Sequence, residues 1–258
     1  MGTPSTALIT GASGGIGYEL AKLFARDSYN LVLVARSADK LAQLASELEK
    51  AYQIRATVVA IDLSQQNGPD QVFAVTQNAG IEVDVLVNNA GFGQFGFYVE
   101  TDLQEELGQI QLNIVSLTHL TKLYVRPMVE RRHGRILNVA STAAFQPGPL
   151  MAVYYATKAY VLSFSEALSN ELRGTGVTVT CLCPGPTATE FVKRASMDMM
   201  KTPYMDAKTV AEIGYRAMLK GRPTVIAGKM NWLVAQSTRL APRAWTAAIA
   251  RKLQEKRK

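Results

Sequence analysis

Residues that commonly carry metal or redox chemistry are scarce in this chain of 258 residues, which has two cysteines and two histidines. Cys181 and Cys183 lie two apart in a run typical of a β-strand, so their side chains point to the same face. There is no second cysteine pair for a disulfide framework, and His119 and His133 are too few to complete a zinc site. We therefore expect both cysteines to be small core residues in a reducing compartment. This predicts a cytoplasmic protein without a bound metal.

Long apolar runs are also missing. No stretch reaches the ~18 apolar residues of a membrane-spanning helix. The first residues do not form a basic segment followed by an apolar one, so no secretion signal is expected. Residues 1–6 formally fit a myristoylation pattern, but so short a pattern recurs by chance and a strand follows almost at once.

Neither sign of charge dominates over most of the chain. There are 28 Lys and Arg against 21 Asp and Glu, a net charge of +7, and the whole excess lies from Lys229 onward, where Glu255 is the single acid. This placement argues against a nucleic-acid-binding surface and leaves a basic tail. The basic residues of the tail are Lys229, Arg239, Arg243, Arg251, Lys252, Lys256, Arg257 and Lys258.

Short apolar runs alternate along the chain with stretches of helical periodicity. Such alternation implies right-handed parallel crossovers, which build a doubly wound α/β sheet of about seven strands with helices on both faces. No linker rich in Pro, Gly or Ser divides the chain, so we expect one domain over residues 1–228 and a basic helical extension over 229–258. The predicted strands are 6–10, 31–35, 56–61, 83–88, 134–140, 177–182 and 224–227, and the predicted helices are about 16–24, 41–48, 67–79, 104–130, 154–172 and 207–220.

A glycine-rich segment, residues 10–17, follows the first predicted strand and opens a helix. This is the context that a dinucleotide-binding fingerprint requires, because glycines let the backbone approach the pyrophosphate and the helix N-terminus offers free N–H donors. The alternative is a tight strand-to-helix turn without a ligand. Further along, Tyr154 and Lys158 lie four apart on one face of a predicted helix, thirteen residues after Ser141. Together the two segments predict a nicotinamide site beside a proton-transfer site.

The glycine spacing is Thr-Gly-x-x-x-Gly-Ile-Gly, and with it the chain resembles the short-chain dehydrogenase/reductase family in its compact single-domain branch. The resemblance covers roughly residues 5–228 and implies a Rossmann-type fold. Its motifs occur in the order of that family: Thr10 to Gly17, Asp62-Leu63, Asn88 to Gly91, Asn113, Ser141, Tyr154 with Lys158, and Pro184-Gly185 with Thr189.

The resemblance implies four catalytic residues. Tyr154 is the general acid of carbonyl reduction and the base of the reverse reaction, and a cation such as Lys158 lowers the pKa of a phenol from about 10. Tyr155 is a rival, but Ala159 stands four residues after it. Ser141, at a strand end, is expected to bond the substrate oxygen, and Asn113 to hold a water that relays protons from Lys158. The alternatives are a buried Tyr with a snorkelling Lys, a cap made by Ser141, and an interhelical hydrogen bond made by Asn113.

The resemblance also implies the cofactor contacts. Thr189 is expected to bond the nicotinamide carboxamide and Asp62 the adenine edge. The implied cofactor-binding residues are Gly11, Ser13, Gly15, Ile16, Gly17, Arg36, Asp62, Asn89, Gly91, Tyr154, Lys158, Pro184, Gly185 and Thr189.

Cofactor choice is predicted from the end of the second strand. Ala35 stands where an NAD enzyme usually has an acid for the ribose 2′-hydroxyl, and Arg36 follows it. Because a guanidinium pairs well with phosphate, we predict NADP (NADPH). The alternative is a solvated Arg. The second basic marker of the family is absent from the glycine loop, where Ser13 and Gly14 stand.

The substrate side is rich in aromatic residues and methionine. These residues lie in the loop after the fourth strand and in an expected lid over about 190–206, and they favour a lipophilic carbonyl or alcohol substrate. Ordinary packing is the alternative. The residues concerned are Phe92, Phe95, Phe97, Tyr98, Phe191, Met197, Met199, Met200, Tyr204 and Met205.

We interpret the chain as an NADP-dependent oxidoreductase that acts on a carbonyl or alcohol. One alternative is a non-enzymatic NADP-binding sensor, although a sensor would be free to lose Asn113, Ser141, Tyr154 and Lys158. Another is an epimerase or dehydratase of the longer branch, for which the chain has too few C-terminal residues. The resemblance implies a homodimer or homotetramer that uses helices 104–130 and 154–172, with contacts from Leu117, Leu120 and Tyr124, or from Phe164 and Leu168.

The tail has an apolar pattern of its own. Trp245, Ile249 and Leu253 recur every four residues, as one helical stripe would. A basic amphipathic helix of this kind can lie in a membrane interface. The interpretation that we favour is a helix that packs on the body or on a partner subunit and ends in a solvated charged stretch.

Overall fold

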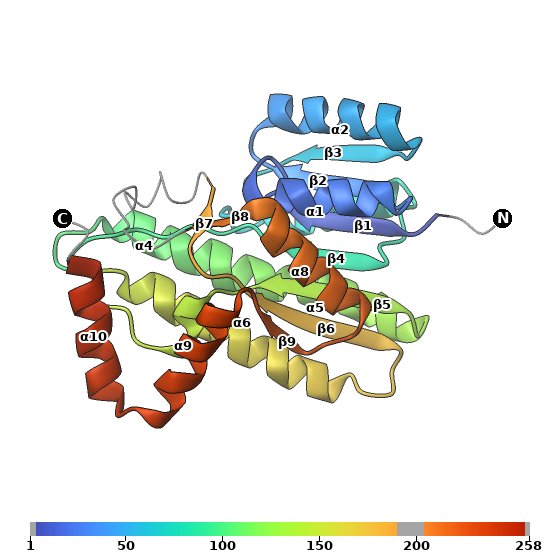
Figure 1. Cartoon of the computed structure of the whole chain (residues 1–258). Coiled ribbons are helices and arrows are strands. Elements are labelled where there is room, and N and C mark those ends of the chain that lie inside the picture. Colours follow the sequence, from blue (N-terminus) through green and yellow to red (C-terminus); the bar gives the residue numbers. More distant parts are fainter. Residues whose placement is uncertain (1–3, 190–203, 256–258) are drawn as a thin grey trace.

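A sheet of seven parallel strands forms the centre of the computed structural model, which describes residues 4–189 and 204–255 (Figure 1). The strand order is β3-β2-β1-β4-β5-β6-β9, and each neighbouring pair is parallel. The order reverses between β1 and β4, so the predicted doubly wound Rossmann-type fold is confirmed. The strands are β1 (Thr6–Thr10), β2 (Asn30–Ala35), β3 (Ala56–Ala60), β4 (Val85–Asn88), β5 (Gly134–Val139), β6 (Val177–Cys183) and β9 (Thr224–Ile226).

Helices cover both faces of the sheet, which is why the central strands are apolar without alternation. One layer contains α1 (Gly15–Arg26), α2 (Ala38–Tyr52) and α8 (Ala207–Leu219). The other layer contains α3 (Gly68–Asn78), α5 (Leu117–Glu130) and α6 (Ala152–Glu171). Helix α4 (Leu103–Ile110) packs beside α6.

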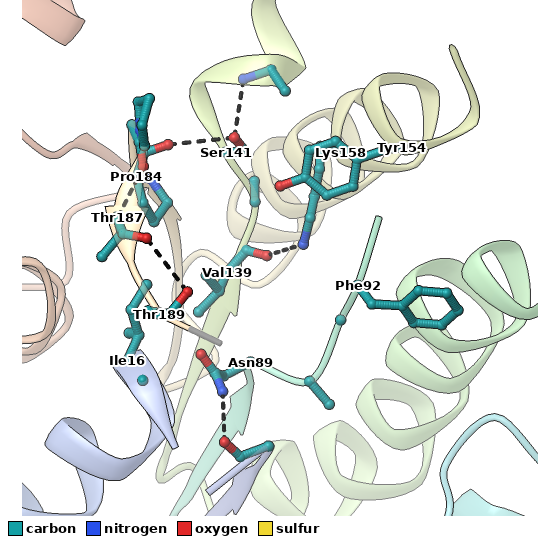
Figure 2. Close-up of a pocket in the computed structure, with 18 of the residues that line it drawn as sticks. Ile16, Asn89, Phe92, Val139, Ser141, Tyr154, Lys158, Pro184, Thr187 and Thr189 are labelled. Atoms are coloured by element: carbon teal, nitrogen blue, oxygen red, sulfur yellow. Dashed lines mark hydrogen bonds between the residues drawn. The ribbon is translucent and has the colours of Figure 1, made fainter. Parts of the chain in front are cut away.

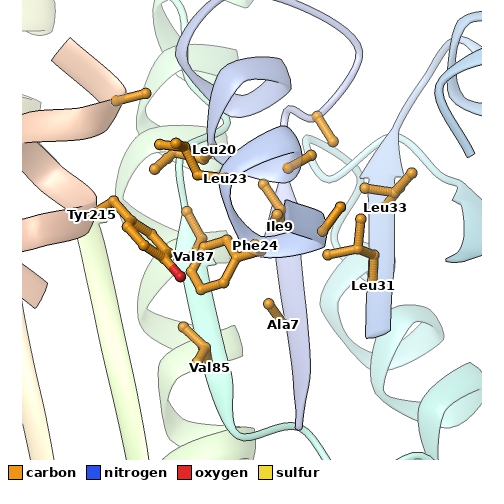
Figure 3. Packing of buried hydrophobic residues seen from close by; sticks show 14 of the residues in the cluster. Ala7, Ile9, Leu20, Leu23, Phe24, Leu31, Leu33, Val85, Val87 and Tyr215 are labelled. Atoms are coloured by element: carbon orange, nitrogen blue, oxygen red, sulfur yellow. The ribbon is translucent and has the colours of Figure 1, made fainter. Parts of the chain in front are cut away.

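Aromatic packing joins α1 to α8 on the first face (Figure 3). The ring of Phe24 meets the ring of Tyr215 edge-on at 4.9 Å and that of Tyr29 at 5.2 Å. The hydroxyl of Tyr215 donates to Asp27 Oδ2 at 2.8 Å. These contacts fix the C-terminal end of α1, and the turn that follows it, against α8.

The predicted long helix over 104–130 is interrupted. Between α4 and α5 lies a π-helical segment, η1 (Gln111–Ser116), in which Ser116 Oγ donates to Gln111 O, five residues back, and to Leu63 O. Apolar periodicity continues through this segment, so the sequence pattern did not reveal it. π-Helical turns of this kind occur frequently at functional sites, and this one contains Asn113.

The residues predicted to make subunit contacts are placed differently. Leu117, Leu120 and Tyr124 are buried in the core of the protomer, so the prediction that they contact a partner is wrong. Phe164 and Leu168 are partly buried against core clusters. The large exposed apolar side chains of the same helices are Leu103, Leu107, Ile110, Val115 and Tyr160. Association itself stays a prediction.

Cys181 and Cys183 are fully buried in β6 with their sulfurs 3.8 Å apart, as free thiols, which confirms them as core residues. Nowhere in the described residues do three or more His, Cys, Asp or Glu side chains gather as metal ligands. None of the described helices has both the length and the hydropathy needed to cross a membrane.

The tail forms two helices, α9 (Lys229–Leu240) and α10 (Arg243–Glu255), which meet in a V at the edge of the molecule (Figure 1). As expected, α10 packs on the body, but it does so with Thr246, Ala250 and Gln254, which are buried. Trp245 and Ile249 of the predicted apolar stripe are exposed instead, at 68% and 59%. The side chain of Leu253 lies outside the described part of the chain.

Candidate active site

The glycine loop between β1 and α1 forms one wall of a cavity of about 600 Å³. Gly11 and Gly15 have φ of +66° and +56°, a backbone conformation that side chains disfavour. The residue that precedes α1, Gly14, has no side chain to cap the helix, so the first amides of α1 border the cavity with Ser13, Gly15 and Ile16. Free amides and the positive end of a helix suit a pyrophosphate.

Gly17 was predicted to bind the cofactor, but it is absent from the lining of this cavity and of its neighbour. A Cβ at this position would lie 2.3 Å from Gly11 O and 2.5 Å from Asn89 Nδ2. The glycine therefore allows α1 to pack closely against the loop.

Asn89 and Thr10 fix the loop to the end of β4. Asn89 Nδ2 donates to Thr10 O at 2.9 Å and to Gly11 O at 3.2 Å. Thr10 Oγ1 in turn accepts from the amides of Asn89 and Ala90 at 2.9 and 3.0 Å. The side-chain amide of Asn89 thus fixes the shape of the glycine loop, and Asn89 also lines the cavity, as predicted.

A second cavity of about 600 Å³ adjoins the first, and the two share lining residues that include Gly11, Arg36 and Gly91. Arg36 lies at the end of β2, and Lys40, which the sequence analysis did not single out, lines the second cavity with it. Asp62 lines the same cavity, and its Oδ1 accepts from Ser64 N at 2.9 Å and Ser64 Oγ at 2.7 Å. The predicted adenosine residues are therefore brought together.

Tyr154 and Lys158 extend from α6 into the first cavity, opposite Ser141 (Figure 2). Lys158 Nζ donates to Val139 O at 2.9 Å and lies 5.8 Å from the centre of the Tyr154 ring. Gly93 gives the ring space, because a Cβ there would lie 2.8 Å from Tyr154 Cδ2. The predicted catalytic pair thus shares one face of α6 and one cavity.

Ser141 follows β5 and begins the short 3₁₀ helix η2 (Thr142–Phe145). Its Oγ accepts from Ala143 N at 3.1 Å and donates to Pro184 O at 3.4 Å. Ser141 therefore caps η2, as the alternative predicted. The same residue also lines the cavity, where a hydrogen bond between the Ser141 and Tyr154 side chains lowers the pKa of Tyr154. The cap holds the hydroxyl in place for that second role.

Burial governs the pKa values of the pair. Desolvation raises the pKa of the Tyr154 phenol well above its ordinary value, against the smaller lowering by Ser141. Burial lowers the pKa of Lys158 to about 8, against the raising effect of the Cys181 and Cys183 thiols. The pKa of Tyr154 in the protein alone is therefore raised and not lowered, contrary to the prediction, because loss of water around the phenolate outweighs the hydrogen bond with Ser141.

Asn113 braces the loop after β4 against α6. Its Nδ2 donates to Phe92 O at 2.9 Å and to Thr157 Oγ1 at 3.1 Å, while Oδ1 accepts from Phe92 N at 3.2 Å. The bond to Thr157 joins η1 to α6, so the alternative of an interhelical hydrogen bond is observed. A Cβ on Gly91 would lie 2.9 Å from Asn113 Oδ1 and 3.4 Å from Lys158 Nζ, so this glycine makes room for both groups.

The segment after β6 forms another wall of the first cavity. Pro184, Gly185, Thr187 and Thr189 line it, and Thr189 Oγ1 donates to Thr187 O at 3.4 Å. This segment continues into β7 (Thr187–Ala188), which pairs with β8 (Met205–Asp206). Gly185 packs against α9, where a Cβ would lie 2.3 Å from Asn231 Nδ2.

The first cavity is also lined by Tyr155, Met151, Phe92 and Tyr204, where a substrate was expected. Of the loop aromatic residues, Phe92 lines both cavities, whereas Phe95, Phe97 and Tyr98 line neither. Tyr155 Oη accepts from Gln254 Nε2 of α10 at 2.9 Å, a contact across 99 residues that no local pattern signals. The predicted lid residues Phe191, Met197, Met199 and Met200 lie outside the described residues, and Met205 lies in β8.

Comparison with known proteins assigns the family. The profile described as "short chain dehydrogenase" matches residues 5–199, so the chain belongs to the short-chain dehydrogenase/reductase family. It is 32% identical over 239 residues to the very-long-chain 3-oxoacyl-CoA reductase of Bos taurus, with 88% of this chain and 76% of that protein covered. It covers 61% of the human protein of the same name.

Solved structures agree with this assignment. A short-chain dehydrogenase from Sphingobium yanoikuyae in complex with NADPH has a TM-score of 0.82 at 30% identity, over 92% of this chain and 94% of that one. The bulky-bulky ketone specific alcohol dehydrogenase of Comamonas testosteroni has a TM-score of 0.80 at 30% identity, over 93% of each chain. A family member from Burkholderia phymatum in complex with NAD has a TM-score of 0.79 at 23% identity, with 90% of this chain and 92% of that one covered. The chain therefore belongs to a family of oxidoreductases that act on CH–OH and C=O groups.

Proposed function

We propose that this protein is an NADP-dependent oxidoreductase that reduces a lipophilic carbonyl compound, or oxidises the corresponding alcohol, with Tyr154 as the general acid and base. The observation that carries the proposal is the meeting of Tyr154, Lys158 and Ser141 in one cavity that continues into a second cavity bordered by Arg36. The uncapped start of α1 lies between these two ends, where a pyrophosphate belongs.

The roles of the residues follow from their environment. When bound, NADPH supplies the hydride that the carbonyl carbon accepts. Tyr154 donates its proton to the carbonyl oxygen, and its raised pKa keeps the phenol protonated at neutral pH. Ser141 and Lys158 stabilise the phenolate that remains, one by its hydroxyl and the other by its charge. Asn113 is a positioning residue, since its amide ties the loop of Phe92 to α6.

The preference for NADP rests on charge. Arg36 and Lys40 both border the second cavity, and Ala35 stands where an acid would repel a 2′-phosphate. The relative from Sphingobium yanoikuyae binds NADPH, whereas the one from Burkholderia phymatum binds NAD, so the shared fold does not decide the cofactor. The basic side chains of this chain support NADP.

The substrate class rests on the apolar lining around Tyr154. Phe92, Met151 and Tyr155 offer apolar surface close to the phenol. The relatives named for a very-long-chain acyl substrate and for bulky ketones are consistent with this interpretation. The test is a panel of aliphatic, steroidal and aromatic ketones assayed with NADPH and NADH. Absence of turnover with every ketone and with the matching alcohols would contradict the proposed activity.

We expect Arg36→Ala to weaken NADPH binding by on the order of 10–100-fold and to leave NADH binding within about 3-fold. A charge-assisted hydrogen bond contributes about 1.5–3 kcal/mol, and only NADPH has the 2′-phosphate that receives it. Fluorescence titration of both cofactors measures the two dissociation constants. Arg55→Ala, an exposed basic residue before β3, is the control and should change neither. Equal losses for both cofactors in Arg36→Ala would exclude the assignment.

We expect kcat/KM for carbonyl reduction to be level below neutral pH and to decline above about pH 8. The decline follows from Lys158, whose pKa is lowered by burial to about 8, because its charge is lost as the pH rises through that value. Tyr154 stays protonated over this range, since its pKa is raised. A pH profile at saturating NADPH measures the midpoint. A level profile up to pH 10 would show that the charge of Lys158 is not required.

A further inference from the structure

The two tail helices are oriented in an unusual way. On α10, the residues that face the body are Thr246, Ala250 and Gln254, spaced four apart, and the large apolar residues Trp245 and Ile249 are exposed. In a globular protein the apolar stripe of a surface helix normally faces the core. Here the stripe faces outward, and the position of the helix is maintained by the hydrogen bond from Gln254 to Tyr155.

The same inversion occurs on α9. Among the side chains of α9 that the structure describes, that of Ala235 is buried, and Asn231 packs against Gly185 and donates to Ala227 O at 2.7 Å. Beside Lys229 and Ser237, the exposed residues of α9 include four large apolar ones. We call these residues and the exposed pair of α10 the tail face, which consists of Met230, Trp232, Leu233, Val234, Trp245 and Ile249.

Charge accompanies the tail face. Lys229 and Lys252 are exposed at opposite ends of the two helices, and Arg251 lies over the ring of Phe97 at 5.9 Å. From Lys229 onward the sequence has eight basic residues and one acid, while the rest of the chain is balanced. Large apolar side chains that stay exposed on two successive helices, beside basic residues, mark an interaction site.

We propose that the tail face docks onto an anionic lipid membrane surface. Tryptophan beside lysine and arginine on an amphipathic helix is the composition of an interfacial helix, in which the apolar side enters the acyl boundary and the cations meet the lipid headgroups. A second copy of the chain is a poorer occupant, because a two-fold contact through this face would place basic residues opposite basic residues. The proposal does not depend on the proposed activity.

Docking in this way brings the cavity close to the lipid. Gln254 and Arg251 of α10 contact Tyr155 and Phe97, and Tyr155 lines the cavity on its substrate side. Figure 1 places α10 beyond the carboxyl ends of the strands, at the same end of the sheet as the cavity. Because the inner side of α10 contacts Tyr155, docking through its outer side would hold the cavity near a lipophilic substrate dissolved in the membrane.

The two tryptophans of the chain make the proposal directly measurable. Both Trp232 and Trp245 lie in the tail face, so fluorescence excited where only tryptophan absorbs, and not the tyrosines, reports on that face alone. We expect the emission to shift to the blue with vesicles of phosphatidylcholine and phosphatidylserine, and not with phosphatidylcholine alone. High salt should reverse the shift, since screening weakens the attraction between the basic residues and the lipid. Trp232→Phe and Trp245→Phe report on each helix separately.

Point variants test the face without removing the helices. Trp245→Glu combined with Ile249→Glu should reduce co-sedimentation with the anionic vesicles by at least ~10-fold, because two apolar side chains no longer enter the lipid. Tyr52→Glu combined with Leu219→Glu is the matched control, since both residues are exposed and apolar but lie outside the tail. Its binding should equal that of the unchanged protein, and circular dichroism should show that both variants are folded.

Three outcomes would overturn the proposal. The first is the absence of pelleting and of any spectral shift with anionic vesicles. The second is equal vesicle binding by the tail variant and the control. The third is loss of a dimer in sedimentation velocity by the tail variant without vesicle binding by the unchanged protein, which would make the face a contact between copies.

Discussion

Tyr154→Phe is expected to lower the turnover of carbonyl reduction by at least about 10²–10⁴-fold, the usual contribution of a general acid. The ring packs against Gly93 and lies near Lys158, and phenylalanine keeps these contacts while it removes the proton donor. Binding of NADPH should therefore change by less than about 3-fold, because the charge-assisted contacts of the cofactor are made elsewhere. Steady-state kinetics with a ketone that the unchanged protein reduces, together with a cofactor titration, measures both quantities.

Tyr155→Phe is the matched control for this experiment. Tyr155 is adjacent in sequence, lines the same cavity and has a hydroxyl of its own, which accepts from Gln254. Its replacement should reduce turnover by less than about 10-fold, because this phenol has no lysine four residues later. Near-normal turnover in Tyr154→Phe, or a larger loss in Tyr155→Phe, would show that the proton comes from another group.

Lys158→Met is expected to separate activity from stability. Turnover should fall by at least about 10²-fold and NADPH should bind more weakly, since the charge beside Tyr154 is lost. The free energy of unfolding at pH 7 should nevertheless rise by about 1–3 kcal/mol, because the variant no longer buries an ammonium, each unit of pKa shift being worth about 1.4 kcal/mol. The hydrogen bond to Val139 O that disappears offsets about 1 kcal/mol of this gain.

The size of this gain in stability depends on pH. The pKa of Lys158 is about 8 in the folded protein, below its ordinary value of 10.5, so the unfolded chain binds more protons between these values. The cost of the buried charge is therefore complete below about pH 8 and is lost as the pH rises toward 10.5. Urea unfolding at pH 7 and pH 10 should show the gain of Lys158→Met at the lower pH only. A variant that is less stable at both values would contradict this explanation.

Local sequence was sufficient to predict the strands and their topology. Buried strands have continuous apolar runs and the helices between them have 3.6-residue periodicity, so the order of elements predicts parallel crossovers. The glycine motif is also local, since Gly11 and Gly15 adopt a positive φ that the turn itself requires. Tyr154 and Lys158 share a helix, and their spacing alone places them on one face.

Other features depend on contacts between distant residues. The pKa direction of Tyr154 was mispredicted because the sequence shows that a lysine is near but not how far the phenol is removed from water. The role of Gly17 depends on the close approach of Asn89, and that of Asn113 on Phe92 and Thr157. These separations exceed the reach of any periodicity.

The sequence by itself therefore determined the fold, the family resemblance and the identity of the groups that gather at the cavity, because each is encoded in the order and spacing of neighbouring residues. Only the tertiary structure decided which side chains of each helix are buried and which are exposed. Leu120 and Tyr124 lie in the core. On α10, Thr246, Ala250 and Gln254 pack against the body, so Trp245 and Ile249 are exposed. The physical reason is that a helical stripe is defined within its own helix, whereas the surface that it meets is set by packing against residues far away in the chain.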